Sequence, residues 1–189
     1  NYARGTSGVG EERKIDFQSF DHPCSMAVEV PDTRHIYNAR TGKYYGLTAR
    51  FKDRFDPMDA RVYALLPYRV TGVSARPVGP VRAGSDAAID IVIDTAKPRV
   101  PARRTAGSGA AIAVETAPLP GKHIVRVDVY DPKGEWRSYY SKNVVTTAGV
   151  GQLTIPFAEN DPAGRWRLEL RDVVTGQKAT VAVAVAATR

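Results

Sequence analysis

Hydrophobic and polar residues alternate along both halves of the chain. Apolar side chains that recur at every second position are typical of half-buried β-strands. A hairpin turn is predicted at residues 40–43, where Gly42 can adopt a positive φ. In the first half this pattern predicts five short strands, at residues 15–17, 26–30, 35–39, 44–51 and 61–66.

The second half repeats the pattern, with tight turns between the segments. Residues 131–134 and 161–164 each read Asp-Pro-x-Gly, and residues 174–177 suit a tight hairpin. Seven antiparallel strands predict a sandwich of immunoglobulin type, here without a bridging disulfide. Residues 95–109 are expected to form a long loop. The predicted strands are residues 87–93, 110–115, 124–130, 136–142, 152–156, 165–171 and 179–185.

A domain boundary is predicted at residues 76–80, which hold two prolines and one glycine and interrupt the alternation. This divides the chain into a small antiparallel β-domain, 1–78, and an immunoglobulin-like sandwich, 79–189. No segment longer than about ten residues has helical periodicity. The predicted fold class is therefore all-β, with two β-sandwich domains in tandem. The 189 residues, of which 43% are apolar, suffice to bury a core.

The chain is basic, with 27 Lys and Arg against 20 Asp and Glu, and a net charge of +7. Such a balance can favour nucleic acids, anionic lipids or acidic polysaccharides. The charge is spread over both halves, however, which indicates a solvated surface. Arg61, Tyr63, Tyr68 and Arg69 are residue types that bind single-stranded nucleic acid, but no ribonucleoprotein motif accompanies them, and we predict no nucleic-acid partner.

No apolar run approaches the roughly 20 residues that span a bilayer, so no membrane span is predicted. Cys24 is the single cysteine, and the fold cannot depend on an internal disulfide. The chain begins at Asn1 rather than Met, as expected of a processed product, a proteolytic fragment or an excised piece of a longer protein. The edge of the predicted strand at 181–185 leaves pairing with another chain open.

Catalytic chemistry finds no support in these residues. A nucleophile needs an activating base, and the histidines are His22, His35 and His123. His22 and Cys24 supply two metal ligands, which is short of a tetrahedral set. We therefore predict no enzyme, no catalytic residue and no metal ligand.

The carboxylates are expected to serve turns. Asp56, Asp131 and Asp161 each precede proline, where Asp stabilises a turn. Calcium is the one cofactor left open, because residues 159–161, or Asp128 with Asp131, offer oxygen ligands. Neither group forms a twelve-residue calcium loop.

Sugar binding requires exposed aromatic faces beside polar groups. Trp136 and Tyr140 share one face of the predicted strand 136–142, and Arg137 and Lys142 lie on the same segment. The alternative is that such aromatics fill the core of the sandwich, as Trp166 is expected to do because it alternates with leucines. The candidate ligand-binding residues are Trp136, Tyr140, Tyr44, Tyr45, Arg137 and Lys142.

Two segments resemble known bacterial families. Residues 35–67, with the Arg-Thr-Gly-Lys hairpin and the Ala-Leu-Leu-Pro strand end, resemble the small β-domain that follows the barrel in some bacterial glycoside hydrolases. Asn38 and Ala39 replace the usual Asp-Val there. Residues 122–185 resemble a bacterial immunoglobulin-like or macroglobulin-type module, through matches at 125–134 and 156–176.

These resemblances concern folding positions and carry over no active site. They imply a non-catalytic C-terminal accessory region of a larger, secreted carbohydrate-active protein, giving structural support or assembly. The alternative they leave is a carbohydrate-binding module. The implied partners are an upstream catalytic domain or another protein, and a polysaccharide. The implied location is secreted, periplasmic or at the cell surface.

Overall fold

A computed structural model describes residues 22–57, 59–96 and 118–188, which form strands and turns only. The all-β class is confirmed. Among these residues no helix is long and apolar enough to cross a membrane. The strands are β1 (Cys24–Asn38), β2 (Tyr44–Phe55), β3 (Tyr63–Leu66), β4 (Val70–Pro77), β5 (Val81–Arg82), β6 (Asp86–Thr95), β7 (His123–Tyr130), β8 (Lys142–Thr146), β9 (Val150–Pro156), β10 (Gly164–Asp172) and β11 (Lys178–Ala186).

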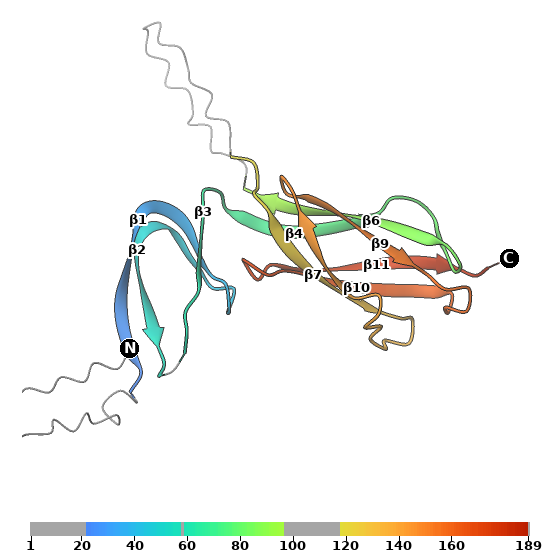
Figure 1. The fold of residues 1–189 in the computed structure, drawn as a ribbon, viewed down its shortest axis with the longest axis horizontal. Coiled ribbons are helices and arrows are strands. Elements are labelled where there is room, and N and C mark those ends of the chain that lie inside the picture. Colours follow the sequence, from blue (N-terminus) through green and yellow to red (C-terminus); the bar gives the residue numbers. More distant parts are fainter. Residues whose placement is uncertain (1–21, 58, 97–117, 189) are drawn as a thin grey trace, which may run out of the picture.

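The N-terminal domain, as far as it is described, is one antiparallel sheet in the order β2-β1-β3. β1 joins the two predicted strands 26–30 and 35–39, with a register shift between Glu29 and Arg34. Such an irregularity bends a strand, and the sheet is visibly curled (Figure 1). The hairpin at 40–43 is confirmed, with Gly42 at φ +74°. The predicted strand 15–17 lies outside the described residues.

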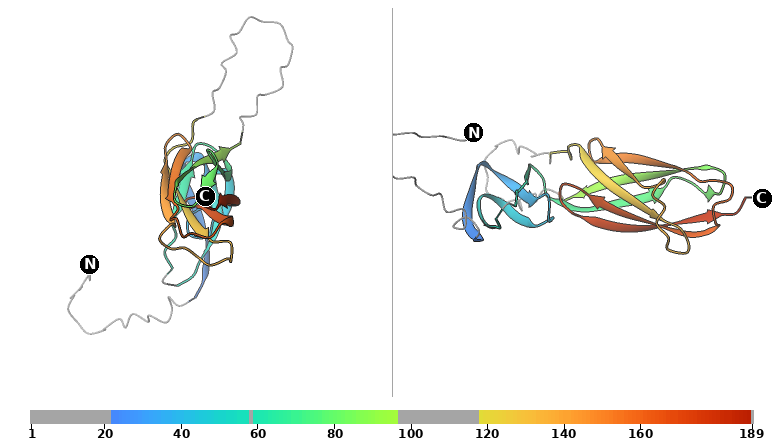
Figure 2. Two further views of the ribbon diagram at one scale, coloured as in Figure 1. Left: turned by 90° about the vertical axis from the view of Figure 1, so that its right-hand side faces the viewer. Right: turned by 60° about the horizontal axis from the view of Figure 1, so that its bottom comes forward.

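The C-terminal domain is a two-layered sandwich (Figure 2). One sheet has the order β5-β11-β10-β7-β8 and the other β4-β6-β9. The orders β11-β10-β7 and β4-β6-β9 are those of strands G-F-C and A-B-E in an immunoglobulin domain. Seven main strands and the two-residue β5 therefore confirm the immunoglobulin-like prediction. Trp166, Leu168 and Leu170 of β10 are at most 2% exposed in the shared core, as predicted.

One predicted strand is wrong and another segment is unexpectedly a strand. Residues 137–140 form turns, and β8 begins at Lys142 instead. The cause is the turn after β7, where the Asp131 carboxylate accepts the N–H groups of Lys133 and Glu135. Such side-chain bonds to the backbone favour a turn over a ladder. The predicted strand 110–115 lies outside the described residues.

The predicted domain boundary after residue 78 comes too late by the length of β4. β4 pairs with β6, and its Val70 and Val73 lie in the core of the sandwich. The sheets divide at residues 67–69. The prolines at 77 and 80 instead mark the place where the chain leaves β4 in one layer and enters β5 in the other. Proline ends a strand because it has no N–H for the ladder.

Candidate functional site

The predicted sugar platform of Trp136 and Tyr140 is not formed. Trp136 is 54% exposed, whereas Tyr140 is 5% exposed and packs against Phe157 and Trp166 in the core. The Tyr140 hydroxyl donates to Asp161 at 2.5 Å. Tyr140 is therefore a residue of the sandwich core, which was the alternative to sugar binding for these aromatics.

The other predicted binding residues are dispersed and engaged in internal contacts. The Tyr44 hydroxyl lies 2.7 Å from His35 Nδ1. Tyr45 packs on Phe51, with ring centroids 4.4 Å apart. Arg137 donates to the buried Asp131 at 2.5 Å, and Lys142 donates to the Thr154 carbonyl at 3.0 Å. Tyr44 and Tyr45 are on β2 and the remaining four are in the other domain, so the six make no single site.

The predicted turn carboxylates act as turn carboxylates. Asp161 accepts the Ala158 N–H at 2.8 Å, and Asp128, a candidate calcium ligand, pairs with Arg126 at 2.7 Å. His22 and Cys24 are both exposed. Within the described parts of the chain, no three His, Cys, Asp or Glu side chains gather as a metal site would require.

A more ordered set of contacts lies at the joint between the two domains, away from the predicted binding residues of the sandwich. A short linker joins β3 to β4 (Figure 1). It has three residues, Pro67, Tyr68 and Arg69, and contacts from both domains restrain it. From the N-terminal sheet, the buried Tyr37 hydroxyl accepts the Val70 N–H at 3.0 Å. From the sandwich, the Gly121 N–H donates to the hydroxyl of Tyr68 in the linker at 2.7 Å. Arg69 reaches back over the Tyr44 ring, 5.2 Å from its centroid.

Two hairpin turns meet beside the linker, backbone against backbone. Gly42, between β1 and β2, has φ +74°, and Gly176, between β10 and β11, has φ +72°. A Cβ on Gly176 would lie 2.7 Å from the Cα of Gly42. Only glycine combines the left-handed conformation with this approach. The two turns define where the domains touch, and we call this contact and the linker together the joint.

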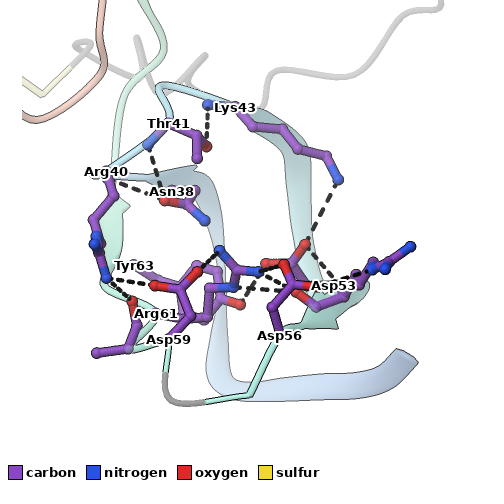
Figure 3. Close-up of polar contacts among 11 residues, drawn as sticks. Asn38, Arg40, Thr41, Lys43, Asp53, Asp56, Asp59, Arg61 and Tyr63 are labelled. Atoms are coloured by element: carbon purple, nitrogen blue, oxygen red, sulfur yellow. Dashed lines mark hydrogen bonds and ion pairs between the residues drawn. The ribbon is translucent and has the colours of Figure 1, made fainter. Parts of the chain in front are cut away.

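The N-terminal turn of the joint is braced by polar contacts (Figure 3). The buried Asn38 accepts the N–H groups of Arg40 and Thr41, which shapes the turn that carries Gly42. Arg40 binds Asp59 at 2.6 Å, and Arg61 binds the same carboxylate at 2.7 Å. The turn is thereby fastened to the loop before β3.

A second carboxylate braces the same sheet from inside. Asp53 is buried and accepts the Tyr63 hydroxyl at 2.7 Å and the Arg54 N–H at 3.0 Å. Burial opposes its ionisation, but these bonds and the nearby Lys43 hold the pKa of Asp53 below its ordinary value. Burial raises the pKa of the neighbouring Tyr45 to about 12. The pair Asp53 and Tyr63 ties β2 to β3 across β1.

The sandwich side of the joint rests on a buried polar chain. Tyr68 lies 3.0 Å from His123 Nε2, and His123 Nδ1 lies 3.0 Å from Asp172. Asp172 also accepts the hydroxyl and N–H of Thr175, and its carbonyl accepts the Gly176 N–H at 2.8 Å. His123 and Asp172 are at most 1% exposed. This series of hydrogen-bonded side chains therefore connects the linker to the turn that touches Gly42.

From the burial of Asp172 we predict that the stability of the protein depends on pH. Burial opposes its charge, but the bonds from His123 and Thr175 lower the pKa of Asp172 below its ordinary value. Unfolding raises that pKa, so the stabilisation is complete above about pH 4 and is lost as pH falls through the folded value. We expect the urea concentration at the unfolding midpoint to decrease as the pH is lowered below 4. This decrease should be less steep in Asp172→Asn. Equal slopes in the two proteins would contradict this.

Sequence reasoning missed the joint. Both turns contain the dipeptide Thr-Gly, at 41–42 and 175–176, and each was recognised as a hairpin signal. Their contact joins segments far apart in the chain, and periodicity carries no information about such contacts. His123 is one of three isolated histidines in the sequence, and its partners Tyr68 and Asp172 approach it only in the fold.

Comparison with known proteins adds little. No family model and no curated protein matches the chain. Among solved structures, a chimeric titin Z1Z2-Z1Z2 tandem functionalised with a GRGDS peptide from fibronectin is similar at 12% identity and a TM-score of 0.28. The alignment covers 89% of this chain and 92% of that one. A similarity of this size carries no information about function.

Proposed function

We propose that this chain is a non-catalytic accessory region of a larger, secreted carbohydrate-active protein, and that it gives structural support. Its two domains would act as one spacer that sets the distance and direction between its neighbours. The resemblances of residues 35–67 and 122–185 supply the context. The joint supplies the physical support, because a spacer works only where its parts keep one orientation.

The observation that carries the proposal is the contact of Gly42 with Gly176. Domains joined by small interfaces move relative to one another by default, so a fixed orientation needs specific restraints. Here the turn contact acts together with a three-residue linker: its Tyr68 accepts the Gly121 N–H, and Val70, the residue that follows it, donates to Tyr37. Bending at the linker would break the Tyr37 bond and separate the turns.

Gly176→Ala tests this proposal. The added Cβ meets Gly42 at 2.7 Å, so the turns must part, and we expect the domains to tumble separately. The measurement is ¹⁵N relaxation of the described strands. In the native protein one rotational diffusion tensor should fit both domains; in Gly176→Ala the correlation time of β1–β3 should fall toward that of a free domain.

Gly134→Ala is the matched control. Gly134 has φ +84°, and a Cβ there meets nothing within 4 Å. Both variants bear a left-handed alanine, which costs about 1–2 kcal/mol, but only one disturbs the joint. Separate tumbling in the native protein, or the same tumbling change in Gly134→Ala, would refute the proposal.

The second candidate is carbohydrate binding. The observation that favours it is that Trp136, one of the predicted residues, is large, aromatic and exposed. Exposed tryptophans are frequent anchors of binding surfaces. The residues beside Trp136 in the structure are Tyr130 and Ser141 instead of Tyr140. These neighbours determine which ligand Trp136 would suit.

A further inference from the structure

Trp136 is the partner of Tyr130 on the outer face of the five-stranded sheet. The two residues form an antiparallel bridge. The Asp131 N–H donates to the Glu135 carbonyl at 3.0 Å, and the Arg137 N–H donates to the Val129 carbonyl at 2.8 Å. These bonds flank the bridge, which makes it a non-hydrogen-bonded pair, the kind whose side chains lie closest together and on one face.

That face points to solvent. Tyr130 ends β7, in which Val125, Val127 and Val129 are fully buried, so residues in alternate positions face outward. The Trp136 indole N–H donates to Ser141 Oγ at 3.0 Å, which limits the freedom of the ring. The result is two neighbouring aromatic side chains, one of them held, on an open sheet surface.

Arginines of β10 line the same face. Arg165, Arg167 and Arg171 alternate with the buried Trp166, Leu168 and Leu170. Arg167 is the register partner of Tyr130, and its guanidinium lies over the Tyr130 ring at 4.4 Å. Residues two apart on a strand are about 7 Å from one another, so Arg165 and Arg167 lie next to the aromatic pair.

The face has a positive balance. Across β7, β10 and β11 it carries five basic side chains, Arg126, Arg165, Arg167, Arg171 and Lys178, and two acidic ones, Asp128 and Glu169. Arg126 pairs with Asp128 at 2.7 Å and Arg167 with Glu169 at 3.0 Å. Arg165, Arg171 and Lys178 form no ion pair with any residue in the described ranges. Three cations are thus available to an anion.

The strand beside the arginines leaves room for a ligand. Outward residues of β11 opposite β10 are small: Thr180, Ala182 and Ala184 face Glu169, Arg167 and Arg165. Two shallow hollows result and meet at Thr180. The charged residues that line the first are Arg126, Arg171, Lys178, Asp128 and Glu169. Those that line the second are Arg165, Arg167 and Asp131.

We propose that this outer face binds an acidic polysaccharide, with Trp136 against a sugar ring, Tyr130 beside it beneath Arg167, and Arg165, Arg171 and Lys178 on carboxylate groups. The inference rests on the second candidate function and replaces its predicted residues. Arginine suits carboxylates because its donors form a fork. We favour a polysaccharide over nucleic acid because Asp128 and Glu169, beside the arginines, can accept hydrogen bonds from sugar hydroxyls. Binding of nucleic acid is an outcome of the test below.

The test is affinity electrophoresis of the full chain in native gels containing polygalacturonate, with dextran as the neutral polymer. We expect retardation by polygalacturonate alone, decreasing as salt is raised. Trp136→Ala and the double variant Arg165→Gln with Arg171→Gln should each weaken the apparent affinity at least about tenfold, which is a loss that one anchoring contact can cause.

Matched controls separate this face from general charge and aromatic content. Tyr139→Ala removes an aromatic that is 62% exposed but lies outside the pair, and Arg50→Gln with Arg76→Gln removes two exposed arginines elsewhere. Both should bind as the native protein does. Retardation by dextran, absence of retardation, equal losses in the controls, or equally tight binding of oligo-dT would each overturn the inference. None of these results bears on the tumbling test of the joint.

Discussion

We expect Asp172→Asn to lower the free energy of unfolding by about 3 kcal/mol, because the buried donors around Asp172 lose their charged acceptor. Asp172 is fully buried and accepts bonds from His123, from Thr175 and from the N–H of Val174. Every one of these partners is a donor. Thr175 donates twice, through its hydroxyl and its N–H, so the amide of Asn places a fifth donor among four, and at least one buried group is left unpaired.

Urea unfolding at pH 7 measures this loss, and Asp32→Asn is the control. Asp32 has a side chain that is 68% exposed and, among the residues that the structure describes, pairs only with Arg34. Exposed pairs contribute about 0–1 kcal/mol, so the control should unfold close to the native protein. A loss below about 1 kcal/mol in Asp172→Asn would mean that the polar chain behind the joint is not a structural support.

Trp166→Ala should be comparably destabilising, by about 3–5 kcal/mol. Trp166 is 0% exposed, packs edge-on to Phe157 at 4.9 Å, and donates its indole N–H to the Pro162 carbonyl at 2.9 Å. Truncation leaves a cavity between the two sheets and an unpaired carbonyl. Unfolding followed by circular dichroism avoids the change in fluorescence that the substitution itself causes.

The chain offers a direct control in its second tryptophan. Trp136 is 54% exposed, and Trp136→Ala removes one bond to Ser141 and no core contact. Its cost should stay below about 1 kcal/mol. Similar losses for the two tryptophans would contradict the assignment of Trp166 to the core and Trp136 to the surface.

The fold was predictable where local pattern and tertiary environment agree. β6, β7, β9, β10 and β11 each alternate buried and exposed residues over most of their length, and Trp166 was expected in the core for that reason. β4 was missed because Pro77 at its end, together with Pro80 after it, resembles a domain boundary. The aromatic spacing of Trp136 and Tyr140 fits a strand, but the buried Asp131 holds a turn at that place.

The site was less predictable because it depends on register and distant contacts. The Arg-x-Arg pattern of β10 shows that arginines share a face, but only the pairing of β10 with β7 brings Arg167 over Tyr130. In the same way, Gly42 and Gly176 are each ordinary turn glycines in the sequence. Their contact exists because the short linker folds the N-terminal hairpin against the end of the sandwich.

The most direct test of the spacer proposal is the relative orientation of the two domains in solution. Backbone N–H residual dipolar couplings of the native chain would be measured for β1–β3 and for β4–β11 in one alignment medium. The proposal predicts that a single alignment tensor fits both sets with the domains as placed by the joint. Two tensors of different magnitude would show independent motion and contradict it.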